Sequence, residues 1–425
     1  MTTGTAAAHR AVEAVWRLES ARIIAGLAGL VRDVGLAEEL AQDALVAALE
    51  QWPAEGIPAN PGAWLMLTAK HRAIDRIRRN ERLGRKLALL GRELETTQDG
   101  APPEFDDALD EGKIDDDLLR LMFIACHPVL STEARIALTL RLLGGLTTEE
   151  IARGFLAAEP TIAKRIVRAK RTLASRQVPF EVPPPAERPA RLASVLEVLY
   201  LVFNEGYSAM AGDDWMRPAL CTEALRLGRV LAGLMPAEPE VHGLIALMEI
   251  QASRIPARLT PAGLPVPLLE QNRGRWDQLL IRRGFTALLR AERRGGPPGP
   301  YVLQAAIAAC HARAHTATDT DWEQIATLYQ ALAALAPSPV VELNRAVAVA
   351  MTDGPGRGLE IVDGLAAEPA LASYHHLPSV RGDLLTKLGR YHEAASEFRR
   401  AASLTRNIPE RTVLLQRAAE CDARA

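Results

Sequence analysis

The residues with the clearest chemical meaning are the basic ones that follow Asn60. The stretch Asn60 to Arg82 reads NPGAWLMLTAKHRAIDRIRRNER, a Pro/Gly turn followed by apolar residues at helical spacing. Nine Lys and Arg residues lie between Lys70 and Arg92, against two acidic residues, which gives a local balance of +7 in a chain of net charge −2. Such segregation indicates a polyanionic partner or a nearby acidic segment.

The same stretch has a simpler interpretation as a solvated surface helix. Asp75 would then pair with Arg78 or Arg79 one turn later. In either case the helix has one apolar side, which we expect to consist of Trp64, Leu65, Leu67, Ile74 and Ile77.

A second basic segment lies further along the chain, in LTTEEIARGFLAAEPTIAKRIVRAKRTL. Thr147 and Glu150 have the spacing of a capping box, so a helix is expected to start at Thr148. A break follows near Phe155, and Pro160 suits the first turn of a second helix. Two short helices joined by a brief turn predict a helix-turn-helix, whose second helix enters the DNA major groove.

The second helix of this pair has a basic outer face opposite a buried side of Ile162, Ile166 and Ala169. Most of the affinity of such a face for DNA comes from phosphate neutralisation, and sequence choice comes from a few base contacts. A basic surface helix unrelated to DNA is the alternative. The outward residues are Thr161, Lys164, Arg165, Arg168 and Arg171, with Lys170 at the edge.

Three sequence phrases resemble bacterial RNA polymerase sigma factors of the extracytoplasmic-function (ECF) type. W-L-x-x-x-A-x-x-x-A-I-D-x-x-R-R, from Trp64, is similar to their promoter-melting helix. A-E-E-L-A-Q-D-A-L, from Ala37, is similar to region 2, and T-I-x-x-R-x-x-R-A-K, from Thr161, to region 4. The departures are Leu45 in place of the usual Phe, a turn without Gly, and Ala163 where Lys is common.

The resemblance implies a role for each phrase. Glu39, Gln42 and Asp43 would face the core polymerase. Thr161, Lys164, Arg165, Arg168 and Arg171 would read the minus-thirty-five box. The minus-ten box, as duplex and as melted non-template strand, would be contacted by Asn60, Trp64, Lys70, Arg72, Arg78 and Arg79.

Two of those minus-ten assignments have competing explanations. Capture of an extruded base needs a snug pocket with a stacking surface and positive charge. Trp64 could be that surface or a core anchor, and Asn60 is the preferred candidate for a polar base contact.

The helix that carries the polymerase-binding phrase is expected over residues 36–52, between a break at Asp33 to Gly35 and a rigid loop at residues 53–62. Its acidic outer face would comprise Glu38, Glu39, Gln42 and Asp43. Its buried side would comprise Leu36, Leu40, Ala44, Leu45, Ala48 and Leu49.

Two linkers divide the chain into the domains that we predict. Residues 93–117 hold eleven acids against Lys113, a composition typical of a disordered tether. It either serves as a plain linker or lies against the basic helix and mimics nucleic acid. Residues 178–191 are rich in proline and form a semi-rigid spacer. The predicted domains are therefore region 2 at 9–92, region 4 at 118–177 and a C-terminal domain at 192–425.

The C-terminal domain is expected to be a stack of helical repeats. Near its end, Gly382, Tyr391, Ala394 and Phe398 have the spacing of a tetratricopeptide (TPR) repeat, in which small residues let two helices approach. Weaker copies precede it. The resemblance extends to the ECF subgroup with a C-terminal TPR-like extension, which implies a domain that controls or enables activity. Such a solenoid binds an unknown protein or peptide partner on its concave face.

Composition is consistent with this fold class. Aromatic residues are scarce at 4%, and Ala, Leu and Arg dominate, which favours helix packing over sheets. We predict an all-α chain with a region 2 bundle, a region 4 helix-turn-helix and a TPR-like α-solenoid. Four cysteines lie far apart, which argues against a disulfide framework. We find no signal peptide or membrane-spanning run, and expect a cytoplasmic protein without a membrane partner.

No constellation for catalysis, metal or cofactor binding is predicted. Cys310, His311 and His315 lack a further ligand at suitable spacing. His375 and His376 are adjacent and would face apart on a helix. Cys126 and His127 are neighbours that rarely meet as nucleophile and base.

One further phrase, FNEGY, remains open. Glu205 and Tyr207 would by default form a buried hydrogen-bonded pair, and a small-ligand pocket is the alternative.

The preferred function is therefore a non-enzymatic sigma factor that directs RNA polymerase to promoters. The alternative is a stand-alone helix-turn-helix regulator or scaffold with a TPR domain. The two differ in the polymerase-binding phrase at Ala37, which a simple repressor does not need.

Overall fold

The computed structural model describes residues 3–90, 111–155, 157–209, 211–212 and 214–425. Most of these residues lie in helices, so the prediction of an all-α fold is confirmed. The chain divides into two compact units, residues 1–198 and 199–425, and the division falls inside one helix, α8. No described helix is long and apolar enough to cross a membrane.

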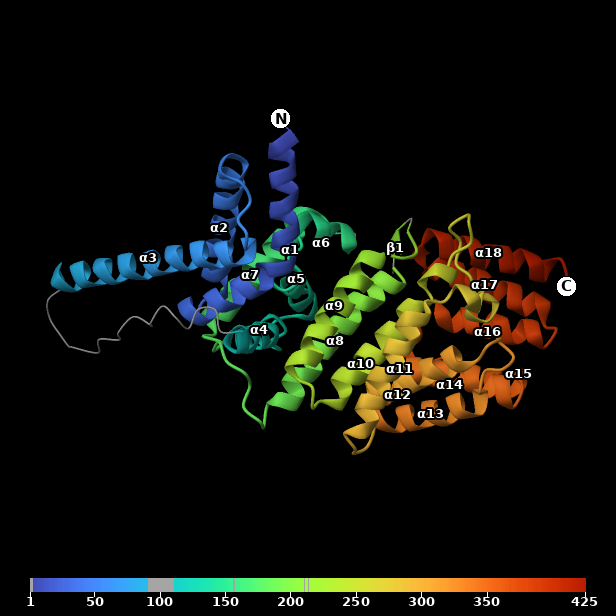
Figure 1. The fold of residues 1–425 in the computed structure, drawn as a ribbon. Coiled ribbons are helices and arrows are strands. Elements are labelled where there is room, and N and C mark those ends of the chain that lie inside the picture. The colour runs from blue at the N-terminus through green and yellow to red at the C-terminus, as the bar shows by residue number, and fades with distance from the viewer. Residues whose placement is uncertain (1–2, 91–110, 156, 210, 213) are drawn as a thin grey trace. The chain divides into compact units, whose positions relative to one another are not determined.

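Within its described residues, the first unit consists of the helices α1 to α7 and the start of α8 (Figure 1). In chain order these described helices are α1 (Thr3–Val31), α2 (Val34–Glu55), α3 (Pro61–Leu90), α4 (Glu111–Ala125), α5 (Thr132–Leu142), α6 (Thr148–Gly154), α7 (Glu159–Ser175) and α8 (Arg188–Tyr207).

The helices α1, α2 and α3 pack against one another around a core of small and aliphatic residues. On α2, Leu40, Ala44 and Ala48 are buried as predicted, whereas Leu36, Leu45 and Leu49 are only half-buried. Asp33 caps α2 by accepting a hydrogen bond from the Leu36 amide over 2.9 Å. The helix continues past Pro53 to Glu55, so the loop that precedes α3 is shorter than expected.

The apolar side of α3 differs from the predicted one. Leu65, Met66, Ala69 and Ala73 are buried, whereas Leu67 is 39% exposed. Ile74 and Ile77 are half-buried. Half of these four buried residues are alanines, which allow neighbouring helices to approach closely.

The predicted acidic linker is shorter than expected, because its last residues form the start of helix α4. Residues 111–117 belong to this helix, and α4 packs against α1. Asp117 is buried and forms an ion pair with Arg120 at 2.6 Å. Acidic residues near a helix N-terminus interact favourably with the helix dipole, which accounts for a helix in so charged a segment. The part of the predicted tether at residues 93–110 lies outside the described residues.

The helix-turn-helix formed by α6 and α7 agrees closely with the prediction. The Thr147 hydroxyl accepts from the Glu150 amide over 3.1 Å, and the Glu150 carboxylate accepts from the Thr147 amide over 2.8 Å. This is the expected capping box. Pro160 lies in the first turn of α7, and the buried side includes Ile162, Ile166 and Ala169.

The proline-rich spacer is also shorter than predicted, because α8 begins at Arg188. The first turns of α8 lie in the first unit and contact the end of α4. Arg191 donates to the Phe123 carbonyl over 2.9 Å, and Ser194 donates to the Cys126 carbonyl over 2.6 Å. Residues 188–191 are thus helical rather than linker.

The second unit contains the rest of α8, two short strands, short 3-10 turns and a succession of helices (Figure 1). In chain order the described elements are β1 (Ala211–Gly212), α9 (Pro218–Leu234), α10 (Pro239–Ser253), η2 (Ile255–Ala257), η3 (Leu268–Glu270), η4 (Arg273–Arg275), α11 (Gln278–Arg293), α12 (Pro300–Arg313), α13 (Trp322–Leu335), α14 (Pro339–Thr352), α15 (Pro355–Gly364), η5 (Pro369–Leu371), α16 (His376–Lys387), α17 (Tyr391–Leu404), β2 (Arg406–Asn407) and α18 (Ile408–Asp422).

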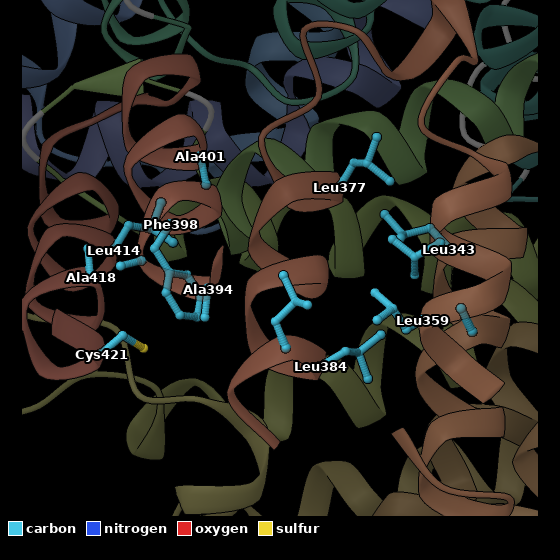
Figure 2. Close-up of a cluster of buried hydrophobic side chains, with 14 of the residues drawn as sticks. Leu343, Leu359, Leu377, Leu384, Ala394, Phe398, Ala401, Leu414, Ala418 and Cys421 are labelled. Carbon is cyan, nitrogen blue, oxygen red and sulfur yellow. The ribbon is translucent and has the colours of Figure 1, made fainter. Parts of the chain in front are cut away.

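From α12 to α18, each helix packs against the next. Figure 2 shows the apolar core between the helices α14 to α18, which includes Leu343, Leu384 and Phe398. Gly382 faces the Phe398 ring so closely that a Cβ atom there would lie 2.9 Å from it. The close helix approach predicted from these two residues is therefore confirmed for the α16 and α17 pair.

The stack of helices is also joined to the start of its own unit. Strand β1 pairs in parallel with β2, which lies between α17 and α18. Asn407 is buried, and its amide donates to the carbonyls of Ala209 and Asp214 over 3.1 and 3.2 Å. This latch departs from a simple open solenoid, in which each repeat contacts only its neighbours.

Candidate nucleic-acid interface

The outer face of α7 presents free positive charge. Thr161, Lys164, Arg168 and Arg171 are exposed and Arg165 is half-buried. Among the described residues, none of these four basic side chains forms an ion pair. Uncompensated guanidinium and ammonium groups on the second helix of a helix-turn-helix can neutralise DNA phosphates and reach base edges.

A groove of about 530 Å³ runs beside this face, between α7 and the start of α5. It is lined by Thr161, Lys164, Arg165 and Arg168 from α7 and by Glu133 from α5, among others. A hydrogen bond from the backbone amide of Glu133, another with Ser131 and the nearby Arg165 hold the pKa of Glu133 below its ordinary value. The ionised Glu133 carboxylate therefore offsets part of the positive charge at this edge of the groove.

The second half of α3 has a similar charge. Arg78 and Arg79 are exposed, and neither forms an ion pair with any described residue, Asp75 included. The pairing expected for a plain surface helix is therefore not formed. Arg72 differs, because it lies 3.7 Å from Asp43 on α2 and is partly compensated.

The start of α3 holds the two residues considered for base capture. The Trp64 ring is half-buried and meets the edge of Trp52 at a centroid distance of 5.6 Å and an interplanar angle of 70°. Of its two predicted roles, this geometry fits the core anchor. Asn60 is exposed, and its side-chain oxygen caps α3 by accepting from the Ala63 amide over 3.0 Å.

Lys70 lies at a cleft rather than on the open face of α3. The cleft has a volume of about 860 Å³ and is formed by α1, α2, α3, α4, α7 and the segment after α7. Arg32, Lys170 and Glu181 also line it. Lys70 therefore differs in surroundings from Arg78 and Arg79, to which the sequence assigned the same role.

Helix α2 presents most of its predicted acidic face. Glu39 and Asp43 are exposed, and Gln42 is half-buried. Glu38 is the exception, with only 3% of its surface exposed. The prediction that Glu38 points outward is wrong, because three polar partners surround its carboxylate.

Those partners connect α2 to the helix-turn-helix. Arg141 on α5 donates to Glu38 Oε1 over 2.7 Å, and Gln42 donates to the same oxygen over 2.8 Å. Lys170 on α7 forms an ion pair with Glu38 Oε2. Lys170 therefore does not belong with the free basic residues of α7, although it lies on the same helix.

The sequence offered no signal for this contact, because Glu38 and Lys170 lie in different predicted domains. Two neighbouring glutamates on an amphipathic helix, such as Glu38 and Glu39, normally indicate a solvated face. Only the packing of α2 against α7 distinguishes the two neighbouring glutamates.

The side chains considered for catalysis have other roles. Cys126 is buried, which raises the pKa of its thiol to about 11, and the thiol is hydrogen-bonded with Thr139 at 3.3 Å. His127 accepts from the Val129 amide over 3.0 Å. A protonated, buried thiol is a poor nucleophile, so these two neighbours do not form a catalytic pair.

Two potential metal ligands on α12, Cys310 and His311, contact residues that are not metal ligands. Cys310 donates to Gln324 over 3.1 Å, and the His311 ring meets the edge of Trp322 at 5.2 Å. His375 and His376, in contrast, correct the prediction that they face apart. Their ring centroids lie 4.0 Å apart, although the His375 backbone is itself in the helical region, with φ −57° and ψ −23°.

The residues of the FNEGY phrase form contacts with partners other than those expected. Glu205 is buried and paired with Arg217, not with Tyr207. The Tyr207 ring stacks on Phe203 at 5.6 Å, and the Arg258 guanidinium lies 3.4 Å from the centroid of Tyr207. The residues of this phrase thus stabilise the junction of α8, α9 and the segment after α10.

Comparison with known families agrees with the two basic helical modules. Residues 18–83 match the model of sigma-70 region 2, and residues 120–173 match that of sigma-70 region 4. Residues 191–292 match a family of unknown function, DUF6596. The chain thus carries the two domains of an RNA polymerase sigma factor, a class of non-enzymatic DNA-binding proteins that act in promoter recognition and transcription initiation.

A curated relative covers nearly the whole chain. The uncharacterized protein R00370 of Rhizobium meliloti (strain 1021) is 45% identical over 379 residues, which are 89% of this chain and 88% of the relative. The chain belongs to the same family as this protein.

Proposed function

We propose that the protein is a sigma factor of the ECF type that binds core RNA polymerase through α2 and reads promoters with α3 and α7. The free basic face of α7, on a helix-turn-helix that matches region 4, carries the proposal. Exposed basic groups that form no ion pair with any described residue can neutralise the phosphates of a polyanion such as DNA.

Each module has its own role in this proposal. Glu39, Gln42 and Asp43 contact the polymerase. Thr161, Lys164, Arg165, Arg168 and Arg171 contact the minus-thirty-five box. Asn60, Trp64, Lys70, Arg72, Arg78 and Arg79 act at the minus-ten box, Trp64 by anchoring α3 and the others by contacting DNA.

The C-terminal unit is proposed to modulate this activity by binding a protein or peptide. The tight α16 and α17 pair supports a TPR-like packing mode, and the β1 and β2 latch would hold the stack in one shape. The site of action is the cytoplasm, where the polymerase and the chromosome are.

The experiment that tests the central proposal starts with the promoter. Genomic DNA is transcribed in vitro by core polymerase with and without the purified chain, and transcript ends that need the chain define promoters. Run-off assays on one such promoter then compare two double variants, Arg165→Ala/Arg168→Ala and Gln42→Ala/Asp43→Ala.

Opposite effects are expected from the two variants. Loss of two DNA contacts at about 1–3 kcal/mol each should lower promoter use by more than tenfold and leave polymerase binding unchanged. The α2 variant should lose polymerase affinity and retain binding to promoter duplex. Glu50→Ala, an exposed carboxylate elsewhere on α2, is the control.

Two results would contradict the proposal. If the chain binds duplex DNA and starts no transcript with core polymerase, a stand-alone helix-turn-helix regulator is the better explanation. If each variant loses both activities equally, the division of roles between α2 and α7 is wrong.

A further inference from the structure

The second unit brings together three side chains that can bind a metal ion. His375, His376 and Glu410 each offer one ligand atom, and these atoms all lie within 4.8 Å of one another. Among the described residues, this is the only such group of three. His375 and His376 lie at the start of α16, and Glu410 lies in the first turn of α18.

The Glu410 carboxylate is fixed in place. One oxygen lies 3.0 Å from His375 Nε2, and the other accepts from the Thr405 hydroxyl over 2.6 Å. Thr405 is buried, and its carbonyl accepts from Arg411 over 2.9 Å. A carboxylate oriented by a buried hydroxyl is the kind of outer-shell support that metal ligands usually have.

The His376 ring is available as the third ligand. It packs against the Tyr374 ring in a T-shaped arrangement, with 5.0 Å between the ring centroids. Its nitrogen atoms form no hydrogen bond with any described residue. The residue is exposed, so an ion and its waters can reach it. The centroids of the two imidazole rings lie 4.0 Å apart at the start of α16.

We propose that His375, His376 and Glu410 bind one divalent transition-metal ion, of which Zn²⁺ is the best fit. Two imidazole nitrogens and one carboxylate are the donor set of zinc and other late first-row ions, whereas Ca²⁺ and Mg²⁺ prefer oxygen ligands. Bonds of about 2.0–2.2 Å place tetrahedral ligand atoms roughly 3.3–3.6 Å apart, so small side-chain rotations close the observed cluster around an ion. The fourth position is left for water or for a ligand from a partner.

The site would act on the latch. Glu410 follows Asn407, whose side chain accepts from the Glu410 amide and donates to the segment around Ala209. An ion held by α16 and α18 would therefore fix the helix start on which the β1 and β2 pairing depends. Metal binding should raise the stability of the second unit, since a ligand that binds only the folded state stabilises it.

The test uses the full chain without a histidine tag, after removal of metal by a chelator. Co²⁺ is titrated and followed by its visible absorption, which reports inner-sphere nitrogen ligands and low coordination number. Zn²⁺ is then added in competition, and thermal unfolding is measured with Zn²⁺ and without it. The variants are His376→Ala, Glu410→Gln and, as control, His392→Ala, an exposed histidine on α17.

The expected result is saturable binding of one ion per chain and a higher Tm with Zn²⁺. His376→Ala should weaken binding at least tenfold, because loss of an outer-shell partner alone costs about 10- to 100-fold. Its metal-free stability should fall only slightly, since the substitution removes the ring contacts with Tyr374 and His375 and no hydrogen bond with any described residue. His392→Ala should behave as the wild type.

Two results would overturn the proposal. If neither Co²⁺ nor Zn²⁺ binds in a saturable way, the cluster is only an ion pair between His375 and Glu410. If His376→Ala binds as tightly as His392→Ala, the ion is held elsewhere. Because His376→Ala removes an exposed side chain, the outcome does not depend on how well Glu410→Gln folds.

Discussion

The two basic helices, α3 and α7, look alike in sequence and differ in structure. On α7 the five residues assigned to DNA are exposed or half-buried, and the four basic ones have no ion-pair partner among the described residues. On α3 the assigned residues divide into groups. Arg78 and Arg79 are free, whereas Arg72 lies near Asp43 and Trp64 packs on Trp52.

This difference indicates two ways of using a basic helix. A helix whose outer face is entirely free can bind duplex DNA as a preformed surface, with little rearrangement. A helix whose first half is anchored and whose second half is free can hold a rigid start next to DNA that is being opened. We therefore expect α7 to dominate duplex affinity and α3 to act mainly in strand opening.

The largest expected effect is on the salt dependence of duplex binding. Replacing Lys164, Arg165, Arg168 and Arg171 together by Ala should nearly abolish promoter binding. If each contacts one phosphate, the slope of log K against log salt should fall by about 3–4, at about 0.9 per phosphate. Titrations of polymerase holoenzyme on promoter duplex at several salt concentrations measure this slope.

A matched control lies on the neighbouring helix. Arg153 on α6 is 71% exposed at its side chain and lies 3.5 Å from Glu149, so its charge is already compensated in part. Arg153→Ala should change the slope by well under one. An equal effect from Arg153 would mean that the field of the whole domain, not the α7 face, controls binding.

The next effect concerns strand opening by α3. Arg78→Ala/Arg79→Ala should leave duplex binding nearly intact and lower the rate of open-complex formation by about tenfold, because two contacts to the single strand are lost. Each lost phosphate contact should also lower the slope of log K against log salt for single-strand binding by about 0.7. Permanganate footprinting of the minus-ten region measures opening. If duplex binding falls as much as it does for the α7 variant, the distinction between the two helices is incorrect.

These contrasts also show how far the sequence could predict the site. The helix-turn-helix was predicted well because the capping box of α6, the first-turn proline of α7 and the apolar periodicity each act within a few residues. The buried state of Glu38 could not be predicted, since Arg141 and Lys170 lie in another module. The approach of His375 to His376 was missed for a local reason, because helical spacing describes the directions in which neighbouring side chains leave the backbone and not the rotamers that bring their rings together.

A third prediction concerns the contact that joins the two modules. Glu38→Gln should lower the free energy of unfolding by about 1–3 kcal/mol, because it removes a charged acceptor shared by Arg141 and Lys170. Both basic side chains are about a quarter exposed and can regain water, which limits the loss. Chemical denaturation measures the change.

The same variant tests whether this contact restrains promoter binding. Since Lys170 is released, region 4 should move more freely relative to region 2, and a fluorescent pair on α2 and α7 should report a wider distance distribution. Glu39→Gln, on the exposed neighbour, should leave both the stability and the distance unchanged. If the two variants behave alike, the contact between Glu38 and Lys170 neither stabilises the fold nor restrains region 4.

The smallest effect separates the two roles of Asn60. Asn60→Ala removes the α3 cap and should cost about 1 kcal/mol in stability, whereas Asn60→Ser keeps a capping oxygen and should cost much less. Both variants remove the amide group that could contact a base. If Asn60 acts on DNA, Ser and Ala should therefore slow promoter opening alike despite their different stabilities. If Asn60 acts only as a cap, opening by the Ser variant should match the wild type, and the anchored start of α3 would then position DNA without reading it.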